Sequence, residues 1–236
     1  MVFVHGGLGP ELTWERQHPL AARWTLLIPT RRAYPGSAPA ERQDFERDAR
    51  DLSPLLNEGA PLVGYSYGGL GCAIAAGQDP DRVLSLTMIE VPLYLVAPGD
   101  PEVEAFAAAG DAFLSGEANA ETEVEFLANA GLGPDTPPQH AKEIARATEA
   151  ARGGRSPREA NPDLEAIVDA GIPTMVVSGN HHTAIESLCD ALADRLHARR
   201  EIVSGAGHAV PRASGFNDVL EGFLRESEGT ARSRTA

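Results

Sequence analysis

The sequence predicts an α/β fold: a mostly parallel sheet of about six strands with helices on both faces and a helical insertion. Short apolar runs alternate with helical patterns along most of the chain, which is typical of parallel strands joined by crossover helices. A glycine-rich turn near residue 66 joins an apolar run to a stretch of small residues. With 236 residues, of which 42% are hydrophobic, the chain can bury one sizeable core.

The expected elements follow from these patterns in chain order. Strands are expected at six apolar runs, residues 2–4, 24–29, 62–65, 83–89, 174–178 and 201–203. Helices are expected between them, over residues 10–23, 41–57, 70–78 and 183–199. The helix over 41–57 is expected to be amphipathic, with Phe45, Leu52, Leu55 and Leu56 on its apolar side.

One segment departs from this alternation. Residues 92–161 contain no convincing strand and are expected to form helical pieces over 103–114, 121–130 and 138–152. We therefore divide the chain into a core, residues 1–91 and 162–236, and an inserted cap segment, residues 92–161. Ligands bind at the carboxyl edge of parallel sheets, so this insertion is expected to be a lid over the pocket. The alternative is a helical layer with no gating role.

The composition limits which binding partners and which cellular compartment are expected. The net charge of −14 and the isoelectric point near 4.9 argue against nucleic acid or an anionic membrane as a partner. Apolar runs stay well short of the roughly 20 residues of a membrane span, and no signal sequence is recognisable. Cys72 and Cys189 lie in apolar helical patterns and are expected to be core thiols rather than a disulfide. We expect a cytoplasmic monomer or homodimer that acts on a small molecule.

The glycine-rich turn is the most informative motif. Gly64-Tyr65-Ser66-Tyr67-Gly68 follows an apolar strand and precedes a helix, which is the pattern of a nucleophile elbow. In this motif strained backbone exposes a serine hydroxyl above the sheet, and the glycines allow strand and helix to approach closely. A glycine-rich turn without chemistry is the alternative, but small residues on both sides of an exposed serine disfavour it.

Two further motifs fall in a consistent order around this turn. His5-Gly6-Gly7 closes the first strand, and Gly205-Ala206-Gly207-His208 closes the last. Together with the elbow, they resemble the α/β-hydrolase superfamily, specifically its small single-domain members with a helical cap. The resemblance covers nearly the whole chain and implies the α/β-hydrolase fold. By this resemblance the sequence begins at what would be the third strand of the family's sheet, so we expect it to lack the family's usual first hairpin.

The resemblance implies roles for several residues. Ser66 is the expected nucleophile and His208 the general base, since a serine hydroxyl attacks poorly until an imidazole takes its proton. The backbone N–H groups of Tyr67 and Gly7, with Leu8 as the next choice, are the expected oxyanion hole. A simple tight turn at residues 5–7 and a surface-loop role for His208 are the alternatives. No metal or other cofactor is implied.

The acidic member of the triad departs from the family pattern. Most relatives carry it in a turn that here reads Gly179-Asn180-His181-His182 and lacks a carboxylate, whereas some carry it after the strand that here ends at Ile89. Glu90 is the preferred substitute, because it ends the neighbouring strand and keeps the order serine, acid, histidine. It could instead be a hinge residue that pairs with an arginine at the base of the cap. The other nearby carboxylates are less suitable: Asp190 and Asp194 face solvent, and Asp169 lies at the opposite sheet edge.

The remaining candidates are less specific. His181 and His182 could suggest a metal site with Glu186, but adjacent side chains diverge and no ligand follows at a recognised spacing, so a structural or pocket-lining role is favoured. His5, Tyr65 and His182 are expected to contact substrate. Arg31 and Arg32 could meet an anionic substrate group, although a solvated or surface-paired role is preferred. Phe106, Phe113, Phe126 and Leu127 could line an apolar pocket or simply pack the cap.

These observations predict a cofactor-independent serine hydrolase that acts on an ester, a thioester or a similar small acyl compound. The alternative is a non-hydrolytic lyase or cyclase, or a catalytically degenerate ligand-binding protein, on the same scaffold.

Overall fold

The protein folds around one parallel sheet, which the computed structural model shows for the residues it describes, 1–130 and 140–234. Its five strands follow chain order from one edge to the other: β1 (Val2–Val4), β2 (Ala60–Tyr65), β3 (Val83–Ile89), β4 (Thr174–Ser178) and β5 (Arg199–Ile202). All four neighbouring pairs are parallel, so the carboxyl ends of the strands meet at one edge.

The expected strand over residues 24–29 is reduced to a single bridge, so the described sheet has five strands rather than about six. Leu27 lies beside Val2, and its backbone accepts from the Phe3 N–H at 2.8 Å and donates to the Met1 carbonyl at 2.9 Å. The amino terminus also donates to the Thr25 carbonyl at 2.8 Å. Pairing cannot extend further because β1 is three residues long and Pro29 has no N–H to donate. Beyond this point the backbone N–H of Arg31 donates to the His5 ring.

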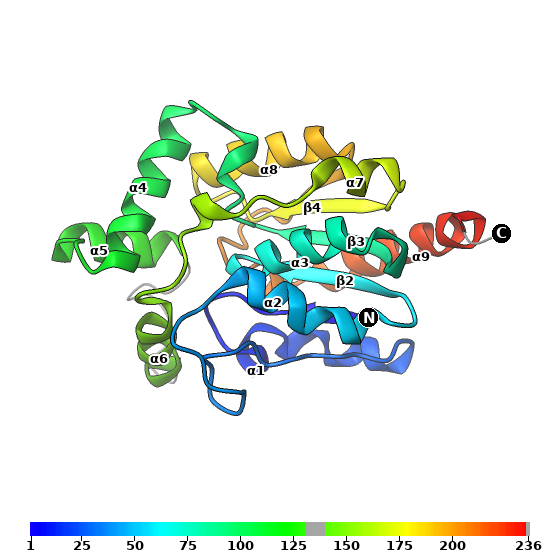
Figure 1. Ribbon diagram of the computed structural model, residues 1–236, viewed down its shortest axis with the longest axis horizontal. Coiled ribbons are helices and arrows are strands. Elements are labelled where there is room, and N and C mark those ends of the chain that lie inside the picture. The colour runs from blue at the N-terminus through cyan, green and yellow to red at the C-terminus, as the bar shows by residue number, and fades with distance from the viewer. Residues whose placement is uncertain (131–139, 235–236) are drawn as a thin grey trace.

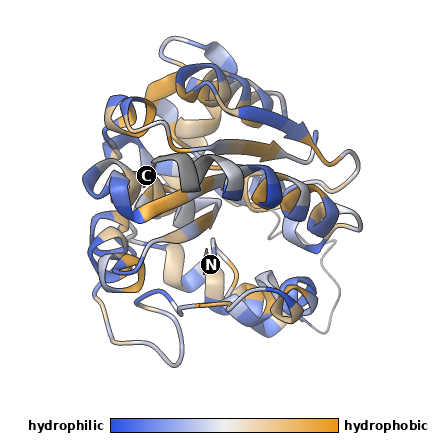
Figure 2. Cartoon of the chain, turned by 90° about the vertical axis from the view of Figure 1, so that its right-hand side faces the viewer, coloured by the Kyte–Doolittle hydropathy of each residue, from blue (hydrophilic) through white to orange (hydrophobic). Residues whose placement is uncertain are grey.

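Successive side chains along each strand point to opposite faces of the sheet and so contribute to two separate layers of the core. Leu62, Met88 and Val176 point to one face, where they pack with helices α2 (Phe45–Leu52), α3 (Tyr67–Gln78), α7 (Leu164–Asp169) and α8 (Thr183–Leu196). Their neighbours Val63 and Ile89 point to the other face, where they pack with helix α9 (Phe216–Arg234). Both faces are therefore buried, as expected for parallel strands with helices on each side. Figure 1 shows these helices around the sheet, and Figure 2 shows hydrophobic colouring on several of the strands and on parts of the helices.

The helices of the core differ in places from the expected ranges. They are α1 (Pro10–Thr13), α2, α3, α7, α8 and α9, with 3-10 helices η1 (Glu15–Ala22), η2 (Ser53–Leu56), η3 (Pro80–Arg82) and η7 (Val210–Arg212). The expected helix over 10–23 is divided at Trp14 into α1 and η1, and Pro19, which has no N–H to donate within a regular α-helix, lies inside η1. The one over 41–57 starts late, where Asp44 caps α2 by accepting from the N–H of Glu46 at 2.9 Å.

The cap segment lies at one end of the sheet (Figure 1). It contains η4 (Tyr94–Val96), α4 (Pro101–Ser115), α5 (Ala120–Asn129), α6 (Ala141–Ala151) and η6 (Pro157–Glu159). Part of the expected piece over 138–152, and the turn at 131–134, fall outside the described residues. The Tyr67 hydroxyl, from the first turn of α3, donates to the carbonyl of Arg155 at 2.9 Å and so ties the segment to the core.

Two further expectations are addressed by the fold. Cys72 and Cys189 are free and buried, which confirms that they are core thiols. Among the described residues, none of the helices combines the length and the apolar character that a membrane crossing needs.

Candidate active site

Ser66 occupies a strained turn between β2 and α3. Its φ of 51° and ψ of −134° lie where side-chain-bearing residues are rarely found, and such strain concentrates at functional sites. The surrounding backbone holds it there, because the Ser66 N–H donates to the Ile89 carbonyl at 2.8 Å. Gly68 is required by space, since a Cβ at that position would lie 2.1 Å from the carbonyl oxygen of His5.

A chain of hydrogen bonds leads from this serine to a buried carboxylate. Ser66 Oγ lies 3.1 Å from Nε2 of His208, and Nδ1 of His208 lies 2.5 Å from Oε2 of Glu90. Glu90 directly follows β3, at a φ of 46° that turns its backbone out of the strand, and its other carboxylate oxygen accepts from the Gly179 N–H at 2.7 Å. The Tyr65 hydroxyl donates to the carbonyl of His208 at 2.9 Å and fixes the loop that carries the imidazole.

The charge on Glu90 sets the tautomer of the histidine. Burial raises the pKa of Glu90, but the interactions with the nearby His181 and His208 rings outweigh it and lower the pKa to about 2. Glu90 is therefore a carboxylate near neutral pH and can only accept hydrogen bonds. His208 must then carry a proton on Nδ1, which leaves the Nε2 lone pair free to accept from Ser66.

The turn that holds the acid in relatives here supports Glu90. Gly179 supplies the N–H described above, and a Cβ there would lie 1.9 Å from the Gly207 carbonyl oxygen, so only glycine fits. Nδ1 of His181 lies 3.4 Å from Oε1 of Glu90, and its Nε2 lies 3.0 Å from the Asn129 carbonyl at the end of α5. Burial lowers the pKa of His181 but the Glu90 carboxylate raises it more, so the pKa is above its usual value.

The other carboxylates considered from the sequence lie elsewhere. Asp190 pairs with Arg200 at 2.8 Å and is largely exposed, and Asp194 is exposed as well. Asp169 ends α7 before β4 begins, at the opposite edge of the sheet.

Two of the expected oxyanion donors lie beside the serine. Gly7 and Tyr67 line the same cavity as Ser66 and His208. Tyr67 is the first residue of α3, where N–H groups have no partner within the helix and the helix dipole favours negative charge. Within the described part of the chain, neither the Gly7 nor the Tyr67 N–H donates to a protein acceptor. Leu8 packs against Ala147 and is not part of the cavity wall.

The cavity above Ser66 has a volume of about 100 Å³ and a mainly apolar wall. Its apolar and aromatic lining comes chiefly from the cap segment and includes Pro92, Tyr94, Phe106, Phe113, Phe126 and Ile185. The Tyr94 hydroxyl makes no hydrogen bond with any described residue, although Tyr94 is only 7% exposed. A Cβ at Gly110 would lie 3.2 Å from the Phe126 ring and 3.7 Å from that hydroxyl, so this glycine keeps the cavity open.

The three expected substrate contacts do not line this cavity. His5 is fully buried: its Nε2 accepts from the Arg31 N–H at 3.0 Å, and its Nδ1–H donates to the Leu8 carbonyl at 2.8 Å. Burial, followed by the charge of Arg31, lowers the pKa of His5 to about 3, which keeps the ring neutral. Tyr65 is buried beside His208. His182 caps α8, with Nδ1 accepting from the N–H of Ala184 at 3.2 Å. These three side chains thus make contacts within the protein instead of lining the cavity above Ser66.

The two arginines also differ from the expectation of a shared surface role. Arg32 pairs with Asp51 at the surface, as expected. Arg31 is 5% exposed and pairs with the buried carboxylate of Asp48 at 2.8 Å, so it meets neither solvent nor the cavity. Sequence reasoning missed the two residues that complete this cluster, Tyr34 and Gln43.

Glu90, His181 and His208 are the one group of three side chains among the described residues that brings metal-ligating atoms together, within 4.8 Å. Both His208 nitrogens are already engaged, by Glu90 and by Ser66. A cation bound here would have to displace the hydrogen bond between His208 and Glu90.

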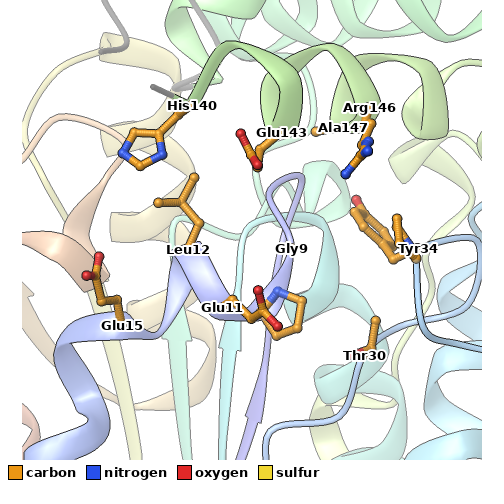
Figure 3. Close-up of a pocket in the computed structure, with 12 residues that line it drawn as sticks. Gly9, Glu11, Leu12, Glu15, Thr30, Tyr34, His140, Glu143, Arg146 and Ala147 are labelled. Carbon is orange, nitrogen blue, oxygen red and sulfur yellow. The ribbon is translucent and has the colours of Figure 1, made fainter. Parts of the chain in front are cut away.

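A second cavity of about 410 Å³ lies between α1 and α6 and is shown in Figure 3. Glu143 and Arg146 enter it from α6, Glu11 and Leu12 from α1, and Tyr34 closes one side. Its wall is more polar than that of the first cavity and contains no member of the chain from Ser66 to Glu90.

Comparison with known proteins agrees with this arrangement. Residues 1–218 match the model of the alpha/beta hydrolase family. The chain belongs to this family. By sequence, no curated protein matches it.

Solved structures of this hydrolase fold resemble the chain at low sequence identity. A 2-hydroxy-6-oxo-6-phenylhexa-2,4-dienoate hydrolase from Rhodococcus sp. strain RHA1 is 16% identical with a TM-score of 0.70, over 95% of this chain and 89% of the other. NosK from Streptomyces actuosus is 22% identical with a TM-score of 0.69, over 96% and 97%. A thermophilic esterase from Thermogutta terrifontis is 20% identical with a TM-score of 0.66, over 96% and 89%. At these identities the likeness concerns the fold.

Proposed function

We propose that this protein is a cofactor-independent serine hydrolase that cleaves esters or thioesters of small, mainly apolar carboxylic acids. The observation that carries the proposal is the continuous chain Ser66–His208–Glu90, with distances of 3.1 and 2.5 Å, opening on an apolar cavity. Nucleophile, base and orienting acid within hydrogen-bond reach are the arrangement by which acyl transfer is recognised.

In the first half-reaction Ser66 Oγ attacks the carbonyl carbon of the substrate while His208 Nε2 takes the hydroxyl proton. The carbonyl oxygen becomes an oxyanion between the N–H groups of Gly7 and Tyr67. Collapse of this intermediate breaks the bond to the leaving alcohol or thiol, which receives the proton from His208. Glu90 stabilises the imidazolium that forms in between without itself taking a proton.

In the second half-reaction water attacks the acyl group on Ser66, and His208 takes the proton of the water. The resulting intermediate releases the carboxylic acid and returns the proton to the serine oxygen. No step needs a metal or an organic cofactor.

The cavity supports a small acyl group. Its volume of about 100 Å³ is below the roughly 150 Å³ of an engineered cavity that binds benzene, so a short acyl chain fits best. The Tyr94 hydroxyl, which has no hydrogen-bond partner among the described residues, can form one hydrogen bond with the bound acyl group. We therefore expect an acyl group with one oxygen on an otherwise apolar chain to bind more tightly in wild type than in Tyr94→Phe.

The alternative, a lyase, cyclase or degenerate binding protein, was suggested by the missing carboxylate in the turn at residues 179–182. The Glu90 carboxylate beside His208 removes that reason for preferring it.

The test is hydrolysis of p-nitrophenyl esters from acetate to decanoate by wild type and Ser66→Ala. We expect a preference for short acyl chains and a loss of at least about 10³-fold in kcat/KM on removing the serine. Equal activity of the two proteins would overturn the proposal. So would a folded wild type that turns over none of these esters or the corresponding thioesters.

A further inference from the structure

We propose that Arg31 and Tyr34 are positioning residues that hold the Gly6-Gly7 backbone so that the Gly7 N–H faces the cavity as an oxyanion donor. The inference rests on the proposed function and extends it to side chains that do not touch substrate. The Gly6-Gly7 loop does not fix this direction by itself. Two successive glycines have the widest backbone freedom of any dipeptide, so sequence alone does not fix the direction of this N–H.

Arg31 fixes the first of the two peptide units around Gly7. Its Nη1 donates to the Gly6 carbonyl oxygen at 3.0 Å. In a trans peptide the carbonyl and the following N–H point in opposite directions, and no cis bond occurs in the described chain. Holding the Gly6 oxygen toward the guanidinium therefore turns the Gly7 N–H away from it. Gly7 is part of the cavity wall, and Arg31 is not.

Tyr34 fixes the second peptide unit. Its hydroxyl donates to the Gly7 carbonyl oxygen at 2.8 Å and lies 3.1 Å from the Gly6 oxygen. Gln43 determines the direction of that hydroxyl proton, because its side-chain N–H donates to the Tyr34 oxygen at 2.9 Å. With its lone pair engaged by Gln43, the tyrosine is left to donate toward the loop. Both peptides that flank Gly7 are thus held from the same side.

The cluster is built to keep this geometry. Nε of Arg31 donates to Asp48 at 2.8 Å, and Nη2 donates to Oε1 of Gln43 at 3.1 Å. Burial alone would lower the pKa of Arg31, but the Asp48 carboxylate more than offsets it, so the pKa is raised and the cation persists. Burial raises the pKa of Tyr34, which keeps its hydroxyl a donor. A cation on the Gly6 oxygen also polarises the peptide and makes the Gly7 N–H a stronger donor.

Neither Arg31 nor Tyr34 contributes to the wall of the reaction cavity. Tyr34 instead borders the second cavity, between α1 and α6 (Figure 3). Loss of the hydrogen bonds from either Arg31 or Tyr34 to the loop should therefore weaken transition-state binding while leaving substrate binding nearly unchanged. The alternative for the same contacts is simple support of the loop, which would affect stability and substrate binding without a selective effect on the oxyanion.

The experiment compares Tyr34→Phe and Arg31→Lys with wild type and with Arg32→Lys. Arg32 is the matched control, because it is the adjacent arginine and its carboxylate partner Asp51 lies at the surface. For each protein, kcat and KM for a p-nitrophenyl ester are measured together with the inhibition constants of a trifluoromethyl ketone and of the product acid. The ketone forms an oxyanion on Ser66, and the acid does not.

We expect Tyr34→Phe to lower kcat about 10-fold or more, with KM within about twofold of wild type. The fall in kcat should not exceed the 10²–10³-fold loss that is typical when one oxyanion donor is removed entirely. Ketone affinity should fall by the same factor, and acid affinity should stay unchanged. Arg31→Lys should show the same selective loss if it folds, and Arg32→Lys should match wild type.

Unchanged kcat and ketone affinity in Tyr34→Phe would overturn the inference while wild type remains an active esterase. Equal weakening of ketone and acid would overturn it too, since that outcome indicates general support of the loop. Failure of the proposed function itself would be recognised separately, because wild type would then hydrolyse no ester.

Discussion

Replacing Glu90 by glutamine should disable the histidine through its tautomer. The carboxylate accepts two hydrogen bonds, one from the Gly179 N–H at 2.7 Å and one from Nδ1 of His208 at 2.5 Å. A glutamine amide has only one oxygen and can accept in only one of these directions. With the oxygen toward Gly179, its NH₂ group faces His208 and favours the tautomer protonated on Nε2. That tautomer cannot take the proton of Ser66.

The opposite amide orientation is disfavoured by the same distances. It would place the NH₂ group against the Gly179 N–H, leaving two donors face to face at a buried site, at a cost of about 1–3 kcal/mol. We therefore expect the first orientation and a kcat reduced by about 10³–10⁴-fold, or about 4–5.5 kcal/mol in activation free energy. The upper figure is the known cost of the equivalent change in a serine protease.

The assay is steady-state hydrolysis of a p-nitrophenyl ester by wild type, Glu90→Gln and Asp190→Asn, with urea unfolding to check folding. Asp190 is the control because it is a rival acid from the sequence and lies on the surface beside Arg200. It should keep wild-type turnover. If Glu90→Gln retains turnover within about tenfold of wild type, or if Asp190→Asn loses it, the assignment of the acid is wrong.

Three further predictions concern stability and the cavity. The pKa of His5 is about 3 when folded and near 6.5 when unfolded, so the unfolded chain binds the extra proton between these values. The contribution of neutral His5 to the free energy of unfolding is intact above pH 6.5. It is lost as the pH falls below that value, at about 1.4 kcal/mol per pH unit. Urea unfolding at pH 7, 6 and 5 should therefore show a shallower loss in His5→Asn, and parallel slopes would refute this. Gly110→Val narrows the cavity beside Phe126 and should lower kcat/KM for hexanoate about 10-fold or more relative to acetate; an unchanged ratio would count against the pocket. Gly68→Ala forces a Cβ against a backbone oxygen and should lower the free energy of unfolding by more than about 2 kcal/mol. The control Gly222→Ala, at a helix position with no atom near the added Cβ, should leave the free energy of unfolding equal or higher. Similar melting temperatures of the two variants would contradict the packing argument.

Local patterns were sufficient to predict most of the fold. Strand β3 and helix α8 each carry an apolar periodicity that only one kind of element can bury. The sixth strand was wrong for a reason outside its own residues, since pairing at Leu27 depends on the length of β1. Helix α9 was not anticipated, although its Phe216 and Leu220 complete the second core layer.

The part of the site that could be predicted depends on where strands end. Parallel strands bring their carboxyl ends to one edge, so a serine after β2, a glutamate after β3 and a histidine after the last strand were expected to lie close together. Distances of 3.1 Å and 2.5 Å join these three groups. Strand order determines this proximity, and strand order is accessible from the sequence.

The direction of loop side chains could not be predicted in the same way. His5 adjoins the oxyanion loop in sequence, but its ring turns inward because the Arg31 N–H and the Leu8 carbonyl bind it there. Likewise, Arg31 reaches Gly6 across 25 positions of chain through an irregular loop with no periodicity to interpret. Such contacts depend on the closed tertiary structure rather than on any local pattern.

The most direct test of the account is to identify the residue modified by a fluorophosphonate. Wild type treated with the probe, digested and analysed by mass spectrometry should carry one adduct, on the peptide that contains Ser66. The Ser66→Ala variant should carry none, and Glu90→Gln should react much more slowly than wild type. An adduct on another residue, or no adduct on folded protein that hydrolyses esters, would contradict the claim that Ser66 is the nucleophile.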